Sequence, residues 1–359
     1  MTAPLLAHNR TYGAIEWNGK GWAITSIEPH VAIRLKQVFA RINKTAKPPF
    51  VLTGGPQLDA DLKWFMDRYP LRISADDAER MGGRKMLFET QQTELGAILA
   101  PNWMPPASVG FRGNMRPYSY QVQAAELVRR TGRLLLMDEM GLGKTVSAIA
   151  AIVAPDYLPA LVVPQTHLPG QWAEKIGEFT ELRTHIVKRT TPYQLPPVDV
   201  VICPYSKLAG WIDYAETAGF KSVVFDEIQE LRSGSTTAKG AAAQAFARLA
   251  QLVLGLSGTP IYNYGEEIWR ICDFLEEGCL GDWFDFVREW CKPGPGGKWL
   301  VKDTEALGTF LRESHLALRR TRTDVGHERK FANTIIHTIS YDEKPLEDRA
   351  AQMAQLARQ

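Results

Sequence analysis

Short apolar runs separated by stretches of helical spacing dominate the chain from Arg133 onward. The runs are "RLLLMD" (133–138), "ALVVPQ" (160–165), "VDVVICP" (198–204), "SVVFDE" (222–227) and "LVLGLSGTP" (252–260). Each run is nearly continuously apolar, which is typical of strands buried on both faces. Five such strands alternating with helices predict an α/β fold with a doubly wound, mostly parallel sheet, in which ligands bind beyond the carboxyl ends of the strands.

The first 99 residues follow a different pattern. "AIEWNGKGWAITS" (14–26) alternates around an Asn-Gly pair and predicts a β-hairpin, while "HVAIRLKQVFARI" (30–42) has apolar residues at helical spacing. "FVLTGG" (50–55) predicts a strand and "LDADLKWFMDRY" (58–69) a short helix. We therefore expect a small α+β accessory domain over residues 1–99. Residues 100–114, rich in Pro, Gly and Asn, are expected to form a linker.

The composition narrows the class of protein. With 45% hydrophobic and 23% charged residues it is that of a globular chain, and no apolar stretch reaches the roughly 20 residues of a membrane span. Nothing at the N-terminus resembles a signal peptide, and the four cysteines form no C-x-x-C pair, which favours reduced thiols over zinc and a cytoplasmic location. The net charge of +2 does not by itself indicate nucleic acid.

"LLLMDEMGLGKTVSAIAAI" (134–152) has the order strand, glycine loop, helix that a phosphate-binding loop requires. Gly141 and Gly143 allow the backbone to direct several N–H groups toward a phosphate, and Lys144 adds a positive charge. Thr145 opens the helix, where its hydroxyl is placed to ligate Mg²⁺. The usual first glycine is replaced by Asp138. The alternative is an ordinary glycine-rich turn, which the G-K-T sequence in this context disfavours.

Two adjacent carboxylates follow the apolar strand in "SVVFDEIQEL" (222–231). Asp226 is placed to hold Mg²⁺, and Glu227 is the candidate that orients and deprotonates the attacking water. Adjacent acids after a strand alone more often mark the N-terminus of a helix. The upstream phosphate loop makes the catalytic interpretation the stronger one.

These motifs resemble a known family. "DEMGLGKT" (138–145), "DEIQ" (226–229), "LGLSGTPIYN" (254–263) and "LRRTRTDV" (318–325), in this order, resemble the first RecA-like motor lobe of Swi/Snf-type ATPases in helicase superfamily two. The resemblance covers roughly residues 115–325. It implies a P-loop lobe that uses ATP and Mg²⁺ to move along double-stranded DNA. In that family Asp138 and Glu139 are regular members of the motif, which accounts for the missing glycine.

Carried over by the resemblance, Gln121 corresponds to the family's adenine-side glutamine, although "RPYSYQ" (116–121) has two extra residues. Gln229 resembles the fourth position of the DEAH or DEAQ box, which in the family helps to couple nucleotide state to the other lobe, and it is counted with the catalytic candidates Lys144, Asp226 and Glu227. The resemblance implies that the nucleotide is bound by Gln121 and by the whole loop, namely Asp138, Glu139, Met140, Gly141, Leu142, Gly143, Lys144 and Thr145.

The resemblance also suggests residues that contact DNA or couple it to hydrolysis. Ser257, Gly258, Thr259 and Asn263 match the family's third motif; the alternative is a tight turn after a buried strand. "VVPQTHLPGQW" (162–172) and "VICPYSKL" (201–208) resemble motifs Ia and Ib, which grip phosphates without reading bases. The candidates there are Thr166, Tyr205, Ser206 and Lys207, with plain loop surface as the alternative.

A second glycine-rich stretch and three histidines are interpreted as structural rather than as functional sites. "KPGPGGKW" (292–299) has no buried strand before it and no Ser or Thr after Lys298, so we interpret it as a turn. The histidines at 167, 185 and 315 have no spacing that suggests a metal, and we treat them as structural.

The accessory domain weakly resembles the HepA-related domain of annealing helicases. Trp17 and Trp22 lie on its predicted hairpin, and four basic residues lie near one helix: Arg34, Lys36, Arg41 and Lys44. The alternative is a solvated basic helix packed on the motor.

Residues 326–359 are too few for a second RecA-like lobe of roughly 150 residues. Arg319 and Arg320 match the end of the first lobe, where packing or a hinge is expected rather than the second lobe's arginine fingers. We therefore expect a second lobe, supplied in a longer chain or by a separate protein, in a bacterial or phage system. The alternatives are a strand-separating or annealing helicase of superfamily two and a non-catalytic ATP- or DNA-binding module.

Overall fold

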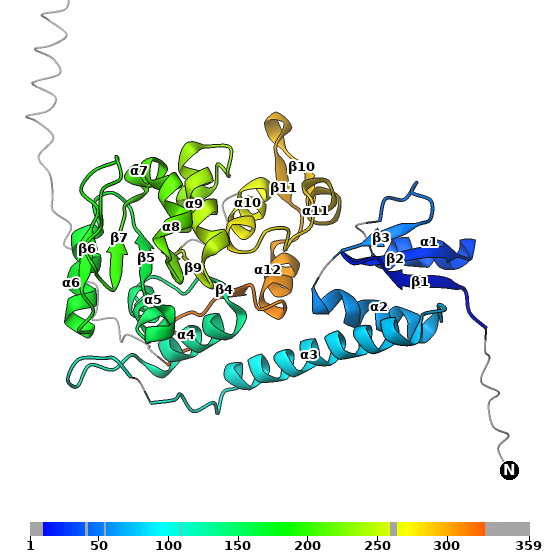
Figure 1. Cartoon of the computed structure of the whole chain (residues 1–359), viewed down its shortest axis with the longest axis horizontal. Helices are drawn as coiled ribbons and strands as arrows, with labels where there is room; N and C mark the ends of the chain where they lie inside the picture. Colours follow the sequence, from blue (N-terminus) through cyan, green and yellow to red (C-terminus); the bar gives the residue numbers. More distant parts are fainter. Residues whose placement is uncertain (1–9, 40–41, 54, 108, 259–263, 327–359) are drawn as a thin grey trace, which may run out of the picture. The chain divides into compact units, whose positions relative to one another are not determined.

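The computed structural model describes residues 10–39, 42–53, 55–107, 109–258 and 264–326. These residues form a three-stranded antiparallel sheet near the N-terminus, a seven-stranded parallel sheet and a two-stranded hairpin, together with their helices (Figure 1). Among these residues no helix is both long and apolar enough to cross a membrane.

The N-terminal sheet has the order β1-β2-β3, with strands β1 (Gly13–Trp17), β2 (Trp22–Ile27) and β3 (Phe50–Leu52). The predicted hairpin is confirmed, because β1 and β2 pair antiparallel. Its turn is held by the Asn18 side chain, which accepts hydrogen bonds from the backbone N–H groups of Lys20 and Gly21. Helices α1 (Pro29–Val38) and α2 (Pro56–Arg68) bury their apolar faces with this sheet in one core that includes Trp22, Leu35 and Phe65.

Helix α3 (Ala75–Leu99) was not predicted from the sequence. Ser74 caps it by accepting a hydrogen bond from the N–H of Asp77 at 3.1 Å. Met81 packs in the N-terminal core, whereas Leu95 belongs to a core of the parallel sheet. Most side chains between these two residues are exposed, so the helix lacks the apolar periodicity by which a helix is recognised.

Seven parallel strands form the larger sheet, and the predicted α/β class is confirmed. The order is β12-β4-β9-β8-β5-β7-β6. The five predicted runs are β4 (Arg133–Leu136), β5 (Ala160–Val163), β7 (Val200–Ile202), β8 (Ser222–Phe225) and β9 (Leu252–Leu256). The two edge strands, β6 (Thr184–Ile186) and β12 (Ala317–Leu318), were not predicted.

Helices cover both faces of this sheet, which explains why its strands are apolar throughout (Figure 1). On β4, Leu134 and Leu136 face α4 (Ser119–Thr131), α5 (Lys144–Ile152) and α6 (Pro169–Phe179), while Leu135 belongs to the opposite core. The opposite core contains α7 (Tyr205–Leu208), α8 (Ala215–Ala218), α9 (Ala238–Leu249) and α10 (Gly265–Leu275). Short 3-10 turns join several elements: η1 (Pro155–Tyr157), η2 (Ala209–Tyr214) and η3 (Ile228–Leu231).

The second glycine-rich stretch is a turn, as predicted. β10 (Cys291–Pro293) and β11 (Trp299–Val301) pair antiparallel around η4 (Pro295–Gly297). The hairpin lies between α11 (Trp283–Trp290) and α12 (Thr304–Glu313) in the chain. Gly296 and Gly297 both have positive φ, so the stretch uses its glycines for chain reversal.

Candidate functional site

The phosphate loop lies between β4 and α5, at the carboxyl edge of the parallel sheet. Gly141 and Gly143 have φ values of 90° and 73°, which side chains rarely allow. A methyl group on Gly143 would also lie 2.6 Å from Nε2 of Gln121, closer than real contacts permit. Glycine at position 143 therefore suits the backbone conformation of the loop, and a side chain there would have to displace the Gln121 amide.

Lys144 is turned into its own loop. Its Nζ donates a hydrogen bond to the backbone oxygen of Asp138 at 2.8 Å. Burial lowers the pKa of Lys144, and the carboxylates of Glu227, Asp138 and Asp226 act in the opposite direction. A half-buried cation on a glycine-containing loop fits a triphosphate, because charge neutralisation is stronger where water is partly excluded.

The side chain of Asp138 has a different environment from the one expected of a nucleotide contact. It is fully buried, and Oδ1 and Oδ2 accept hydrogen bonds from Nε and Nη2 of Arg320 at 3.0 and 2.6 Å. Nη1 of Arg320 donates to the backbone oxygen of Tyr120 and to Oε1 of Gln123, both on α4. The aspartate therefore anchors the start of the loop to the end of the lobe and to α4.

Gln121 also contacts the loop. It is buried, its Oε1 accepts from the N–H of Tyr118 at 2.9 Å, and its Nε2 donates to the oxygens of Leu142 and Gly143 at 3.0 and 3.4 Å. The hydroxyl of Tyr120 donates to the same Leu142 oxygen at 3.0 Å. In this structure the expected adenine-side glutamine joins the start of α4 to the phosphate loop.

The two carboxylates follow β8 directly. Oδ2 of Asp226 accepts a hydrogen bond from the indole Nε1 of Trp172 at 2.8 Å. Burial raises the pKa of Asp226, and the Trp172 hydrogen bond opposes that rise. Glu227 has a φ of 49°, rare for a residue with a side chain, and such strain recurs at active sites. Gln229 Nε2 donates to Glu227 Oε2 at 2.5 Å, so the glutamine holds the candidate base.

The turn after β9 approaches the phosphate loop. Ser257 is buried, and a methyl group on Gly258 would lie 3.1 Å from Cγ of Met140 and 3.7 Å from Nζ of Lys144. The third-motif turn therefore lies next to Lys144, the candidate phosphate lysine, which sequence spacing could not reveal. The candidates Thr259 and Asn263 lie outside the described residues.

The strand-end loops predicted to grip DNA contain one exposed pair. Thr166 and Ser206 are exposed, and the Thr166 hydroxyl donates to the Ser206 hydroxyl at 3.1 Å. Lys207 is half-buried and donates to the backbone oxygen of Val187 at 2.8 Å. Tyr205 departs from the expectation of a surface contact: it is buried, and its ring stacks on Phe225 with centroids 6.5 Å apart.

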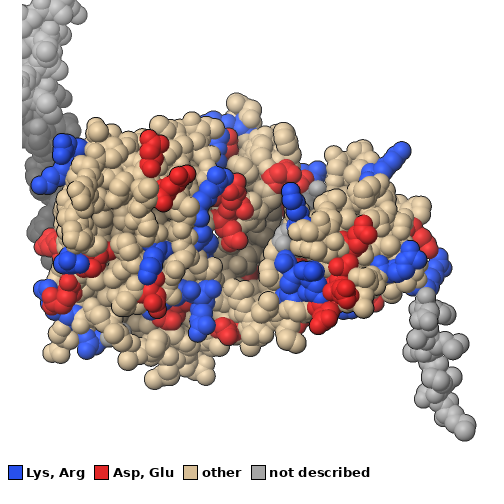
Figure 2. Space-filling view, in the orientation of Figure 1, with Lys and Arg blue, Asp and Glu red and all other residues tan. Residues whose placement is uncertain are grey.

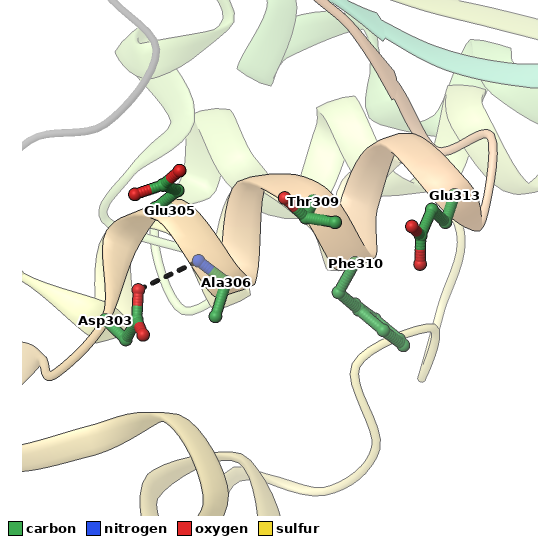
Figure 3. Close-up of a pocket in the computed structure, with 6 residues that line it drawn as sticks. All are labelled: Asp303, Glu305, Ala306, Thr309, Phe310 and Glu313. Carbon is green, nitrogen blue, oxygen red and sulfur yellow. Dashed lines mark hydrogen bonds between the residues drawn. The ribbon is translucent and has the colours of Figure 1, made fainter.

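Outside the nucleotide loop, a hollow lies along α12 (Figure 3). Its carboxylates are Asp303, Glu305 and Glu313, and Asp303 caps the helix by accepting from the N–H of Ala306 at 2.8 Å. Carboxylates repel phosphate, so this hollow does not suit a nucleotide.

Magnesium and ATP fit the residues present. The side chains that would hold the metal are the carboxylate of Asp226 and the hydroxyl of Thr145, which are hard oxygen ligands of the kind Mg²⁺ prefers. Lys144 and the N–H groups near Gly141 and Gly143 would hold the phosphates. When bound, the metal supplies charge neutralisation between the phosphates.

A parallel sheet with a phosphate loop after one strand and paired acids after another defines a RecA-like P-loop lobe. The SNF2-related domain model matches residues 60–350, and the chain belongs to this family. It carries a Swi/Snf-type motor lobe of helicase superfamily two.

Three relatives illustrate the similarity. A Caenorhabditis elegans SWI/SNF-related matrix-associated actin-dependent regulator of chromatin subfamily A-like protein 1 homolog is 27% identical over 58% of this chain and 32% of its own. The mouse DNA annealing helicase and endonuclease ZRANB3 is 28% identical over 46% of this chain and 16% of its own. The Sulfolobus solfataricus SWI2/SNF2 ATPase core in complex with dsDNA has a TM-score of 0.52 and 26% identity over 62% of this chain and 48% of its own. The chain therefore spans less than half the length of these relatives.

Proposed function

We propose that this chain is the ATP-binding lobe of a DNA-dependent ATPase that translocates on double-stranded DNA. The observation that carries the proposal is the placement of Lys144 after β4 and of Asp226 and Glu227 after β8, so that all three follow strands of the same parallel sheet. In this arrangement Lys144 neutralises phosphate charge and Asp226 holds the metal. Glu227, held by Gln229, orients and deprotonates the attacking water.

Duplex DNA as the partner is supported by the bound dsDNA of the Sulfolobus relative and by the exposed Thr166–Ser206 hydroxyl pair. Uncharged hydroxyls and backbone N–H groups contact phosphates without reading sequence. On the face shown in Figure 2, Lys and Arg side chains are interspersed with Asp and Glu. The proposed contacts on this lobe are therefore assigned to the strand-end loops.

We further propose that full turnover requires a second RecA-like lobe, in the same polypeptide or in a separate protein. Arginine fingers from such a lobe accelerate related phosphoryl transfers by about three to five orders of magnitude. Arg320 is already paired with Asp138 within this lobe and is not free to act as one. Its immobilisation supports a structural role.

The accessory domain is proposed to add DNA affinity through phosphate contacts. Arg34 and Lys44 are exposed, whereas Lys36 is half-buried and donates to the backbone oxygens of Lys44 and Ala46 at 2.8 and 2.6 Å. Lys36 therefore shapes the loop after α1, and the exposed pair is the better candidate for DNA. Arg41 lies outside the described residues.

ATP hydrolysis by the purified chain tests the proposal, measured without DNA, with duplex and with single strands, and with or without an added second lobe from a SNF2-family relative. We expect the chain alone to bind ATP, more tightly with Mg²⁺ than in EDTA, and to show little turnover. Duplex-stimulated hydrolysis should appear once the second lobe is present. Stronger stimulation by single strands would favour a strand-separating helicase. ATP binding without hydrolysis under every condition would favour the non-catalytic module.

A further inference from the structure

The carboxylate proposed to hold the metal has a neutral partner that lies 54 positions away in the sequence. Trp172 stands in the first turns of α6, with a 2% exposed fraction, and its indole Nε1 donates to Oδ2 of Asp226 at 2.8 Å. The backbone of Asp226 is fixed separately, because its N–H donates to the oxygen of Val163 on β5. Main chain and side chain of this aspartate are thus each held by a neighbouring element.

The chemistry of the donor decides what this contact can do. An indole N–H only donates, carries no charge and does not ligate metals. A lysine or arginine in its place would neutralise the carboxylate and compete with the cation. The indole instead fixes one oxygen and leaves the negative charge and the second oxygen, Oδ1, for a metal ligand role.

We propose that Trp172 is a positioning residue that orients the Asp226 carboxylate for Mg²⁺. This inference rests on the proposed nucleotide function. Hydrogen-bond partners behind metal ligands typically contribute about 10- to 100-fold in metal affinity, so loss of the indole N–H should weaken the metal and leave the phosphate contacts intact.

The structure supplies a matched control. Trp22 donates its indole N–H to the buried Asp59 at the same 2.8 Å distance, in the N-terminal core. Asp59 also accepts from Nε of Arg84 at 2.8 Å and keeps that partner when the indole is removed. Trp22→Phe therefore removes the same kind of bond at a site without nucleotide chemistry.

The experiment titrates Mg²⁺ into the full chain with a fluorescent N-methylanthraniloyl ATP and repeats the binding measurement in EDTA. Trp172→Phe should raise the Mg²⁺ concentration for half-maximal binding by about tenfold, while Trp22→Phe matches wild type. Affinity in EDTA should be the same for all three. Equal Mg²⁺ midpoints for the two variants would overturn the inference. So would a loss of ATP affinity in Trp172→Phe that is as large in EDTA as it is with Mg²⁺. Failure of wild type to bind would instead refute the nucleotide function.

A second measurement does not depend on Trp172→Phe folding. In ¹⁵N-labelled protein, the indole resonance that moves in Asp226→Asn identifies Trp172. We expect that resonance to move when Mg²⁺ is added to the ATP-bound wild-type chain and to stay in place when ATP binds in EDTA. An unchanged indole signal on addition of Mg²⁺ would show that the hydrogen bond is structural only.

Discussion

Arg320, near the end of the described lobe, forms a buried bidentate ion pair with Asp138, the residue that stands where phosphate loops usually have their first glycine. The aspartate is fully buried and the arginine is 8% exposed. The same guanidinium reaches Tyr120 and Gln123 on α4, and Gln123 in turn donates to the oxygen of Ile98 at 2.7 Å. The unusual loop residue thus connects α3, α4, the phosphate loop and the end of the lobe.

Breaking this pair should be costly. Asp138→Asn leaves a buried guanidinium without its counter-charge, and such changes typically cost about 3–5 kcal/mol. Denaturant unfolding measures the difference in the free energy of unfolding. Glu94→Gln, which removes an exposed partner of Arg130 at 3.4 Å, is the control and should stay within about 0.5 kcal/mol of wild type. Similar destabilisation in both variants would show that burial of the pair does not matter.

Mutations at Lys144 and Glu227 should distinguish ATP binding from ATP cleavage. Lys144→Ala removes the cation that neutralises the phosphates and should weaken ATP binding as well as abolish hydrolysis. Glu227→Gln keeps the Asp226 carboxylate proposed to hold the metal, so it should bind ATP but lose the cleavage that wild type shows once the second lobe is added. A fluorescent ATP analogue measures binding directly. Equal loss of binding in the two variants would contradict the assigned roles.

Gly143→Ala tests the shape of the phosphate loop. A side chain at φ of 73° costs roughly 1–2 kcal/mol, and its methyl group would also press on Gln121. We expect about tenfold weaker ATP binding by isothermal titration calorimetry, which corresponds to about 1.4 kcal/mol. Gly177→Ala in α6 has open space around it and should leave ATP binding unchanged while slightly raising stability. Unaltered binding in Gly143→Ala would argue against a glycine requirement at the loop.

The accessory domain can be tested by charge removal. Replacing Arg34 and Lys44 together by glutamine should weaken duplex binding and flatten the plot of log affinity against log salt concentration, by about one unit of slope for each DNA phosphate that is no longer neutralised. Fluorescence anisotropy across several salt concentrations measures this slope. Lys63→Gln is the matched charge control, because Lys63 is paired with Asp67 at 3.1 Å. An unaltered slope in the double variant would make the domain a docking element.

His315 gives a pH prediction. It is buried at a φ of 56°, its Nδ1 has no hydrogen-bond partner among the described residues, and burial lowers its pKa below the usual 6.5. The unfolded chain then binds a proton at a higher pH than the folded one, so stability falls as the pH drops through about 6.5 toward the folded pKa. His315→Asn should flatten this dependence, since asparagine does not titrate and tolerates the left-handed conformation. Urea midpoints at a pH of about 7.5 and about 5.5, on either side of the ordinary histidine pKa, should differ less than in wild type.

The sequence by itself determined the fold class and the positions of the nucleotide motifs. Nearly continuous apolar runs are local signals of doubly covered strands, and "GLGKT" and "DEIQ" are contiguous patterns whose meaning follows from their own spacing. The N-terminal hairpin was equally readable, because its alternation and its Asn-Gly turn are local.

Only the tertiary structure decided which groups meet. Helix α3 has no apolar period, and the edge strands β6 and β12 are short enough that their pairing depends on neighbours. Asp138 and Arg320 are 182 positions apart, and Trp172 and Asp226 are 54 apart. Such contacts follow from the order of strands in the sheet and from which helix packs behind each strand end, and neither is encoded in the periodicity of any single segment.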